Sequence, residues 1–147
     1  MTCTFFGHRD APNEIEPILI SVLEELITNE HVELFYVGNQ GRFDNMVRKS
    51  LKQLKEKYSF IRYWVVLAYM PGKKDAFCEE DDDTIYPEGL ETTPPKYAIS
   101  KRNRWMIEQS DYVITFVEYS QGGAGQFQEI AQRKGKRVIK LTDMMPK

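Results

Sequence analysis

Hydrophobic positions along this chain follow two patterns that alternate from its beginning to its end. Short continuous runs of β-branched and aromatic residues predict buried strands, and stretches with an apolar residue at every third or fourth position predict helices with one buried face. The predicted strands are Thr2–Phe6, Val32–Val37, Ile61–Tyr69, Tyr112–Val117 and Arg137–Leu141. The predicted helices cover residues 15–27, 46–54, 97–109 and 125–134. This alternation indicates an α/β fold, a doubly wound and mostly parallel five-stranded sheet with helices on both faces.

The alternation is interrupted once, between residues 71 and 95. This segment holds several prolines and glycines and an acidic run, and it has no sustained periodicity. It is longer than the roughly 12–15 residues usual for a loop without structure of its own. We therefore predict either a functional flap or a locally disordered insert. The whole chain, residues 1–147, has a length suited to a single domain with one core.

Glycines follow three of the predicted strands. They are Gly7 after the first strand, Gly38 and Gly41 after the second, and Gly122, Gly123 and Gly125 after the fourth. In a parallel sheet these strand ends meet at one edge, where ligands bind near the switch in strand order. Glycine lets the backbone approach a ligand closely, and the N–H groups at a helix start attract anions. The three loops together predict a phosphate or nucleotide site.

The net charge and the amino-acid composition limit the kinds of partner and cofactor that this protein is expected to bind. The formal net charge of −2 argues against a nucleic-acid partner, and the basic residues within 48–57 and 133–137 are interpreted as a solvated helix face and a helix end. Two cysteines and two histidines offer no disulfide framework and no metal site, so we expect no metal and no cofactor. The chain lacks a signal-peptide pattern and an apolar run of about 20 residues, so we expect a cytoplasmic protein outside the membrane.

A longer motif extends the glycine loop. Ser100-Lys101-Arg102-Asn103 and Ser110-Asp111 precede the fourth strand, and Gly122-Gly123-Ala124-Gly125 with Glu129 follows it. This order resembles the SLOG superfamily, the Rossmann-like fold of the DNA-processing protein DprA and of the LOG enzymes, over nearly the whole chain except residues 71–95. LOG enzymes cleave the N-glycosidic bond of nucleoside monophosphates. The resemblance implies a Rossmann-like domain, a nucleotide or nucleotide-derived ligand, and a homo-oligomer.

The resemblance also implies roles for particular residues. Arg102 would clamp the phosphate, and Glu129 would act as the catalytic carboxylate that stabilises positive charge on the sugar. The residues assigned to ligand binding are Gly7, His8, Arg9, Gly38, Asn39, Gly41, Gly122, Gly123, Ala124, Gly125 and Gln126. However, Gln121 and Gln126 stand where LOG enzymes have a proline and a phosphate-binding threonine. We therefore expect a binding or sensing module first, a LOG-like phosphoribohydrolase second, and single-stranded nucleic-acid binding as in DprA third.

Four of these polar residues also have an ordinary structural interpretation. Glu129 is equally typical of an acid in the first turn of a helix, where it complements the helix dipole. Arg102 can be a solvated helix residue, and His8 a loop histidine bonded to backbone. Asp44, just after the second glycine turn, is interpreted as a helix N-cap.

Overall fold

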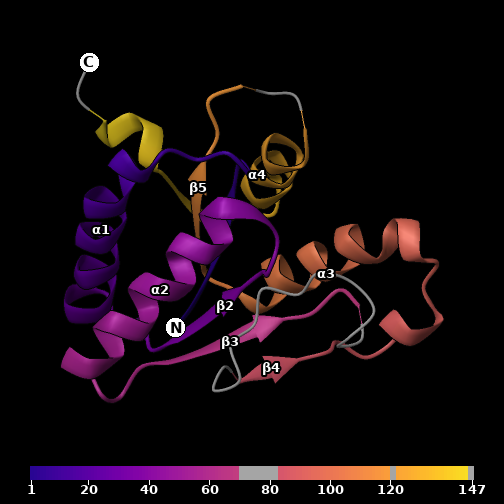
Figure 1. The fold of residues 1–147 in the computed structure, drawn as a ribbon, viewed down its shortest axis with the longest axis horizontal. Helices are drawn as coiled ribbons and strands as arrows, with labels where there is room; N and C mark the ends of the chain where they lie inside the picture. Colours follow the sequence, from indigo (N-terminus) through magenta and orange to yellow (C-terminus); the bar gives the residue numbers. More distant parts are fainter. Residues whose placement is uncertain (70–82, 120–121, 146–147) are drawn as a thin grey trace.

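The computed structural model of the protein describes residues 1–69, 83–119 and 122–145 (Figure 1). Within these residues the strands are β1 (Thr2–Gly7), β2 (Leu34–Val37), β3 (Arg62–Val66), β4 (Thr84–Ile85), β5 (Tyr112–Phe116) and β6 (Arg137–Lys140). They form one sheet in the order β4-β3-β2-β1-β5-β6, and every neighbouring pair is parallel. The predicted α/β class is confirmed, and the predicted count of five strands is corrected to six.

Helices cover both faces of this sheet (Figure 1). The α-helices of the described residues are α1 (Glu16–Asn29), α2 (Gly41–Lys57), α3 (Pro95–Gln109) and α4 (Gly123–Arg133). Three short 3₁₀ turns accompany them, η1 (Asn13–Ile15), η2 (Leu90–Thr92) and η3 (Leu141–Met144). Helices α1 and α2 pack on one face, and α3 and α4 pack on the other. The fold is therefore doubly wound, as the pattern predicts.

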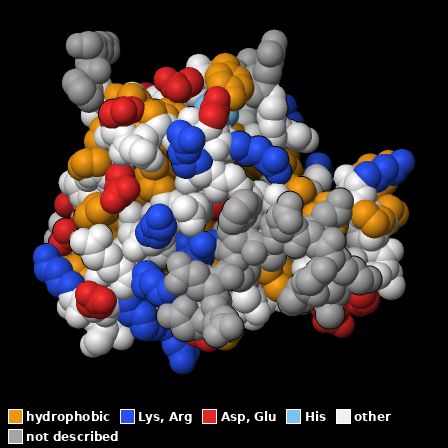
Figure 2. Space-filling view, viewed as in Figure 1, with side chains coloured by type: hydrophobic (Ala, Val, Ile, Leu, Met, Phe, Trp, Pro, Cys, Tyr) orange, Lys and Arg blue, Asp and Glu red, His pale blue; other side chains and the backbone are white. Residues whose placement is uncertain are grey.

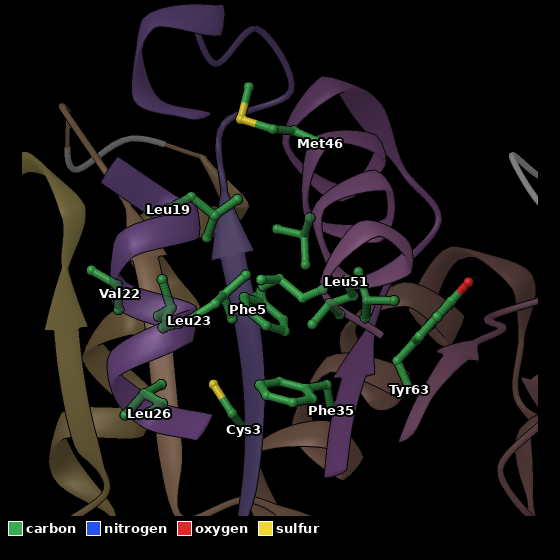
Figure 3. Close-up of a cluster of buried hydrophobic side chains, with 14 of the residues drawn as sticks. Cys3, Phe5, Leu19, Val22, Leu23, Leu26, Phe35, Met46, Leu51 and Tyr63 are labelled. Atoms are coloured by element: carbon green, nitrogen blue, oxygen red, sulfur yellow. The ribbon is translucent and has the colours of Figure 1, made fainter. Parts of the chain in front are cut away.

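A hydrophobic core lies on each face of the sheet, and two neighbouring residues of β1 point into different cores. Phe5 lies between Leu23 of α1 and Leu51 of α2, and its ring stacks on Phe35 of β2 (Figure 3). The next residue, Phe6, stacks on Phe127 of α4 with ring centroids 5.5 Å apart. Because successive side chains of a strand point to opposite faces, each strand serves both cores. This explains why the central strands are continuous apolar runs rather than alternating ones.

The insert between residues 71 and 95 is the main difference from the predicted elements. Residues 71–82 lie outside the described part, but residues 83–95 hold β4, η2 and the start of α3. Strand β4 has only two residues, which is too short for any periodicity to appear. Leu90 packs with Ala68 and Ala98 in a small third core. The described part of the insert is thus joined to the sheet and to α3.

Strand bounds also differ from the predicted ones. Val32, Ile61 and Leu67 are buried but lie outside the strands to which the pattern assigns them. Hydrophobicity reports burial, and a residue that enters or leaves a strand can be buried without joining the ladder. The pattern therefore overestimates the lengths of β2, β3, β5 and β6, while it locates the five predicted strands correctly.

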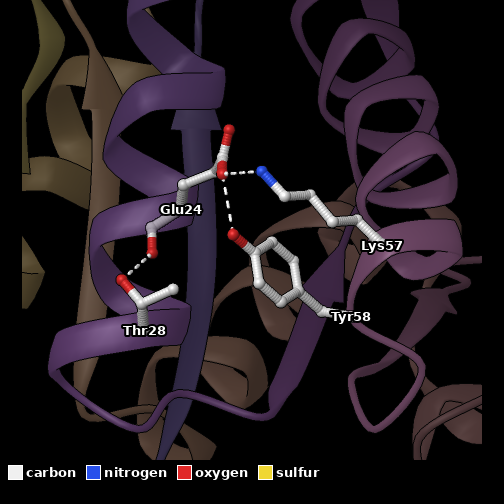
Figure 4. Close-up of polar contacts among 4 residues, drawn as sticks. All are labelled: Glu24, Thr28, Lys57 and Tyr58. Carbon is white, nitrogen blue, oxygen red and sulfur yellow. Dashed lines mark hydrogen bonds and ion pairs between the residues drawn. The ribbon is translucent and has the colours of Figure 1, made fainter.

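A polar clamp joins α1 to the end of α2 at the edge of the first core (Figure 4). Lys57 Nζ and the Tyr58 hydroxyl both donate hydrogen bonds to Glu24 Oε2, at 2.9 and 2.8 Å. These bonds, first that of Lys57 and then that of Tyr58, lower the pKa of the Glu24 carboxyl. The clamp fixes how the two helices meet on their common face of the sheet.

Candidate nucleotide site at the sheet edge

A cavity of about 510 Å³ lies where the strand order of the sheet reverses. From β1 the chain builds the sheet outward through β2, β3 and β4, and it then returns to place β5 on the other side of β1. Gly7 pairs with Phe116, so the loops after β1 and β5 leave the sheet at the same level. This is the switch point at which open α/β sheets bind ligands. The cavity is lined by residues 5–10, Gln40, Asp44, Ile99, Arg102, Asn103, Met106, Tyr119, Gly122, Gly123, Ala124 and Phe127.

A larger hollow of about 850 Å³ lies along the outer side of α1. Among the described residues, those that line this hollow all belong to α1 or to the turn before it. It therefore lacks the second wall that encloses a ligand, and the cavity at the switch point is the better candidate site.

Arg102 is the central polar side chain of the cavity. Its side chain crosses from α3 to the sheet, where Nη1 donates to the backbone oxygen of Val66 at 2.9 Å and to Asn39 Oδ1 at 3.3 Å. Its Nε donates to Asn103 Oδ1 at 2.8 Å. The residue is only 2% exposed, so its interpretation as a solvated helix residue is wrong. Among the described residues Nη2 has no hydrogen-bond acceptor, which leaves its N–H groups available to a ligand.

Asp44 supplies negative charge close to this guanidinium. Burial raises the pKa of the Asp44 carboxyl, while the charge of Arg102 and a hydrogen bond from the Gln40 backbone N–H act in the opposite direction. The helix N-cap is Gln40, so the predicted capping position is wrong by four residues. Asp44 instead accepts the N–H of the cap residue from inside the first turn. Burial likewise lowers the pKa of Arg102, and Asp44 opposes that shift.

The glycines at the ends of β1 and β2 make room for protein side chains. A Cβ on Gly7 would lie 2.4 Å from the Phe43 ring, and one on Gly38 would lie 2.6 Å from Asp44 Oδ2. These two glycines therefore allow α2 to pack against the strand ends. Gly7 still lines the cavity, whereas Gly38 does not. The sequence interpretation, in which every strand-end glycine opens the backbone to a ligand, is too broad.

The turn between β5 and α4 is different. A Cβ on Gly122 or Gly123 would meet no atom of the described residues within 4 Å, and both glycines line the cavity. Gly122 has φ +95°, a conformation that favours glycine, and α4 begins at the next residue. Gly123 and Ala124, the first residues of α4, both line the cavity, and the first N–H groups of a helix have no partner within that helix. Gln121 lies outside the described residues.

His8 is a loop histidine bonded to backbone, as its structural interpretation predicts, and it also lines the cavity. Its Nε2 accepts the backbone N–H of Glu118 at 2.8 Å, which ties the loop after β1 to the loop after β5. An acceptor role at Nε2 assigns the proton of the neutral ring to Nδ1. The ring also stacks on Tyr119 and forms part of the cavity wall. Arg9, next in the chain, is exposed at the cavity and donates to Gln40 Oε1 at 3.1 Å.

Glu129 is not among the residues that line this cavity, so the structure does not bring it together with Arg102 as the sequence interpretation expects. Phe127 and Ala131 of α4 are buried against the sheet, and Glu129 lies two residues from each, which is about 200° around a helix. Its side chain is 60% exposed and pairs with Arg133, one turn further along α4. Because α4 begins at Gly123, Glu129 lies beyond the first turn, and its interpretation as an acid in the first turn of the helix is also wrong. Glu129 lines a separate groove between α3 and α4.

Some of the other predicted binding residues also lie outside the lining of the cavity. Asn39 and Gly41 are absent from the lining of the cavity, although Asn39 supports Arg102 from behind. Gln126 lines the groove between α3 and α4 together with Glu129, and Gly125 lines neither hollow. Helical spacing accounts for this, because Ala124 and Phe127 take the side of α4 that faces the cavity. Within the described ranges no group of three His, Cys, Asp or Glu side chains could hold a metal ion.

The lining residues that sequence reasoning missed include Asp10, Tyr119, Asp44, Asn103 and Phe127. The sequence could have suggested Asn103, because it is a polar residue directly after Arg102, and Asp44, because it lies about one helical turn after Gly41. Tyr119 is a loop aromatic without periodicity, so its position became evident only from the contact with His8.

Comparison with known proteins gives the fold. No protein-family model matches the chain, and no curated protein matches it. DNA processing protein A from Helicobacter pylori, whose structure was described for its single-stranded DNA binding mode, has a TM-score of 0.64 and 15% identity. DprA from Streptococcus pneumoniae has a TM-score of 0.65 and 16% identity. Both alignments cover 95% of this chain, which spans 64% and 49% of those two proteins.

This likeness confirms the coarse part of the family resemblance. Both neighbours are DprA chains, so the Rossmann-like fold expected from the SLOG motifs is the fold of the protein. At 15–16% identity the likeness carries fold alone. Features specific to LOG enzymes find no support in it. Among the helices of the described residues, none is long and apolar enough to cross a membrane.

Proposed function

We propose that this domain binds a phosphorylated nucleoside, or another nucleotide-derived ligand, in the cavity between the ends of β1 and β5. One observation carries the proposal. The buried guanidinium of Arg102 and the start of α4 at Gly122 and Gly123 line the same cavity. Both are groups that bind anions.

The phosphate would interact with both groups at once. Helix starts attract anions through free N–H groups and the helix dipole, and a guanidinium can hold two phosphate oxygens. Arg102 is held in place by three hydrogen bonds before any ligand arrives, so little side-chain freedom is lost on binding. A cavity of about 510 Å³ is within the range that encloses small ligands.

Calorimetry with AMP, ADP-ribose and a cyclic nucleotide tests the proposal. The informative variant is Gly123→Ala, because Gly123 lines the cavity and the added methyl group would meet no atom of the described residues within 4 Å. Alanine at a helix start does not weaken the fold, whereas loss of a charge-assisted phosphate contact weakens binding by about 10- to 100-fold. Glu129→Gln, outside the cavity, is the matched control and leaves binding unchanged. No binding of any of the three ligands at millimolar concentration contradicts the proposal.

Single-stranded DNA is the second candidate, because a structural neighbour binds it. The net charge argues against it, but Figure 2 shows Lys and Arg side chains gathered on the face that α2 presents. Arg42, Lys49 and Lys55 of α2 are exposed. If DNA is the ligand, the affinity for an oligothymidine falls steeply with salt, and AMP competes with it. Fluorescence anisotropy of a labelled oligonucleotide measures both effects.

A LOG-like phosphoribohydrolase is the remaining alternative, and the geometry changes the residue that it would need. Glycoside cleavage requires a carboxylate near the sugar. The carboxylates that line the cavity are Asp10 and Asp44, and Asp44 is occupied by the Gln40 N–H. If the protein releases free base from a nucleoside monophosphate, Asp10→Asn should abolish release and Glu129→Gln should not. Chromatography of the free base measures this.

A further inference from the structure

Two aromatic rings from different loops stack at the wall of the cavity. The ring of Tyr119, after β5, lies flat on the imidazole of His8, after β1, with centroids 3.8 Å apart and planes 3° from parallel. Tyr119 is 51% exposed, while His8 is buried. Both residues line the cavity. The stack therefore places a large aromatic surface on the same wall as the proposed phosphate-binding groups.

His8 holds this surface in a fixed position. Its Nε2 accepts the Glu118 N–H at 2.8 Å, and the edge of its ring meets Phe116 of β5 with centroids 6.0 Å apart. The imidazole is thus fixed by the sheet, and Tyr119 lies on it. Among the described residues His8 is the one ring that stacks on Tyr119, which is 51% exposed, so the opposite face of Tyr119, here called its open face, has no stacked ring. An exposed aromatic that is already ordered costs little further entropy when a ligand stacks on it.

We propose that Tyr119 is a stacking platform for the planar ring of the ligand, and that His8 is the residue that positions it. The inference rests on the proposed function: the phosphate lies at Arg102 and the start of α4, and the base lies on the open face of Tyr119. Stacking on an aromatic side chain tolerates every base, because each base has a π-face. The site is therefore selective for a nucleotide over a sugar phosphate, and not for one base over another.

Calorimetry with two probes, AMP and ribose 5-phosphate, separates the base from the phosphate. We expect the wild-type protein to bind AMP more tightly than ribose 5-phosphate. Tyr119→Ala weakens AMP binding by about 5- to 100-fold, the range for loss of one base–aromatic stack, and leaves ribose 5-phosphate binding unchanged. Tyr119→Phe, which keeps the ring, restores AMP binding. Because Tyr119 is exposed, we expect both variants to fold, and their thermal unfolding curves test this.

The outcomes distinguish the two proposals. If the wild-type protein binds neither probe, and also neither ADP-ribose nor the cyclic nucleotide, the proposed function is wrong. If it binds both equally, or if Tyr119→Ala weakens both by the same factor, the phosphate site stands and the stacking platform is wrong. His8→Ala tests the positioning role. It should weaken AMP binding in the wild-type background and cause no additional loss in the Tyr119→Ala background, whereas an additional loss means that His8 acts on the ligand independently of Tyr119.

Discussion

Replacing Arg102 by methionine tests whether this buried charge holds the site together. The substitution keeps a side chain of similar length but removes three hydrogen bonds, to Val66, Asn39 and Asn103. It also leaves the Asp44 carboxylate without the guanidinium that opposes its burial. Three polar acceptors and one charge inside the protein thus lose a partner in a single step.

The magnitude follows from these losses. A hydrogen bond to a charged group contributes about 1.5–3 kcal/mol, and three are lost at once together with the electrostatic attraction between Arg102 and Asp44. These contributions overlap, and methionine regains some apolar burial. We therefore expect the free energy of unfolding to fall by about 3–5 kcal/mol. With a denaturant slope of about 2 kcal/mol/M, the urea midpoint falls by about 2 M.

Urea unfolding followed by tryptophan fluorescence measures this change, since the chain has two tryptophans, Trp64 and Trp105. Arg133→Met is the control, because Arg133 is exposed and its pair with Glu129 contributes about 0.5 kcal/mol or less. A loss below about 1 kcal/mol for Arg102→Met, or a loss equal to that of the control, refutes the role assigned to Arg102. Adding Asp44→Asn to Arg102→Met should recover part of the lost stability, because the unpaired charge is then removed.

Three further predictions address other parts of the structure. Gly7→Ala places a methyl group 2.4 Å from the buried Phe43 ring, so the free energy of unfolding should fall by about 1–3 kcal/mol in urea titrations, and an unchanged midpoint contradicts this. Hydrogen bonds, first the one from Lys57, lower the pKa of the Glu24 carboxyl in the folded state. The ionised carboxyl therefore stabilises the fold at pH values above its pKa in the unfolded chain, and this stabilisation is lost as the pH falls through its pKa in the folded protein. Glu24→Gln should therefore flatten the acid side of a profile of melting temperature against pH, and parallel profiles would refute the clamp. Burial raises the pKa of the Cys3 thiol, so in a Cys78→Ser variant a thiol reagent should react only after unfolding, and rapid labelling of the native protein would contradict the assigned burial.

Local patterns predicted most of the fold because they record burial between near neighbours. A helix such as α1 shows its buried face through residues three and four apart, and β5 shows burial on both faces as one apolar run. Strand β4 was missed because two residues cannot show a period, and its pairing depends on β3, which is distant in the chain. The grouping of glycines at strand ends correctly located the edge of the sheet that holds the cavity.

The amino-acid sequence by itself thus determined the class of the fold, the positions of its main elements and the edge of the sheet where a site forms. The tertiary structure decided which side chains share that site. It buried Arg102 in the cavity and turned Glu129 away from it, because the rotation of α4 is set by Phe127 and Ala131 packing on the sheet. It also brought Tyr119 onto His8, across more than a hundred residues of chain. The spacing of apolar residues along the chain predicts which residues are buried. Which side chains meet in a cavity depends instead on strand order and helix rotation, and only long-range packing determines these.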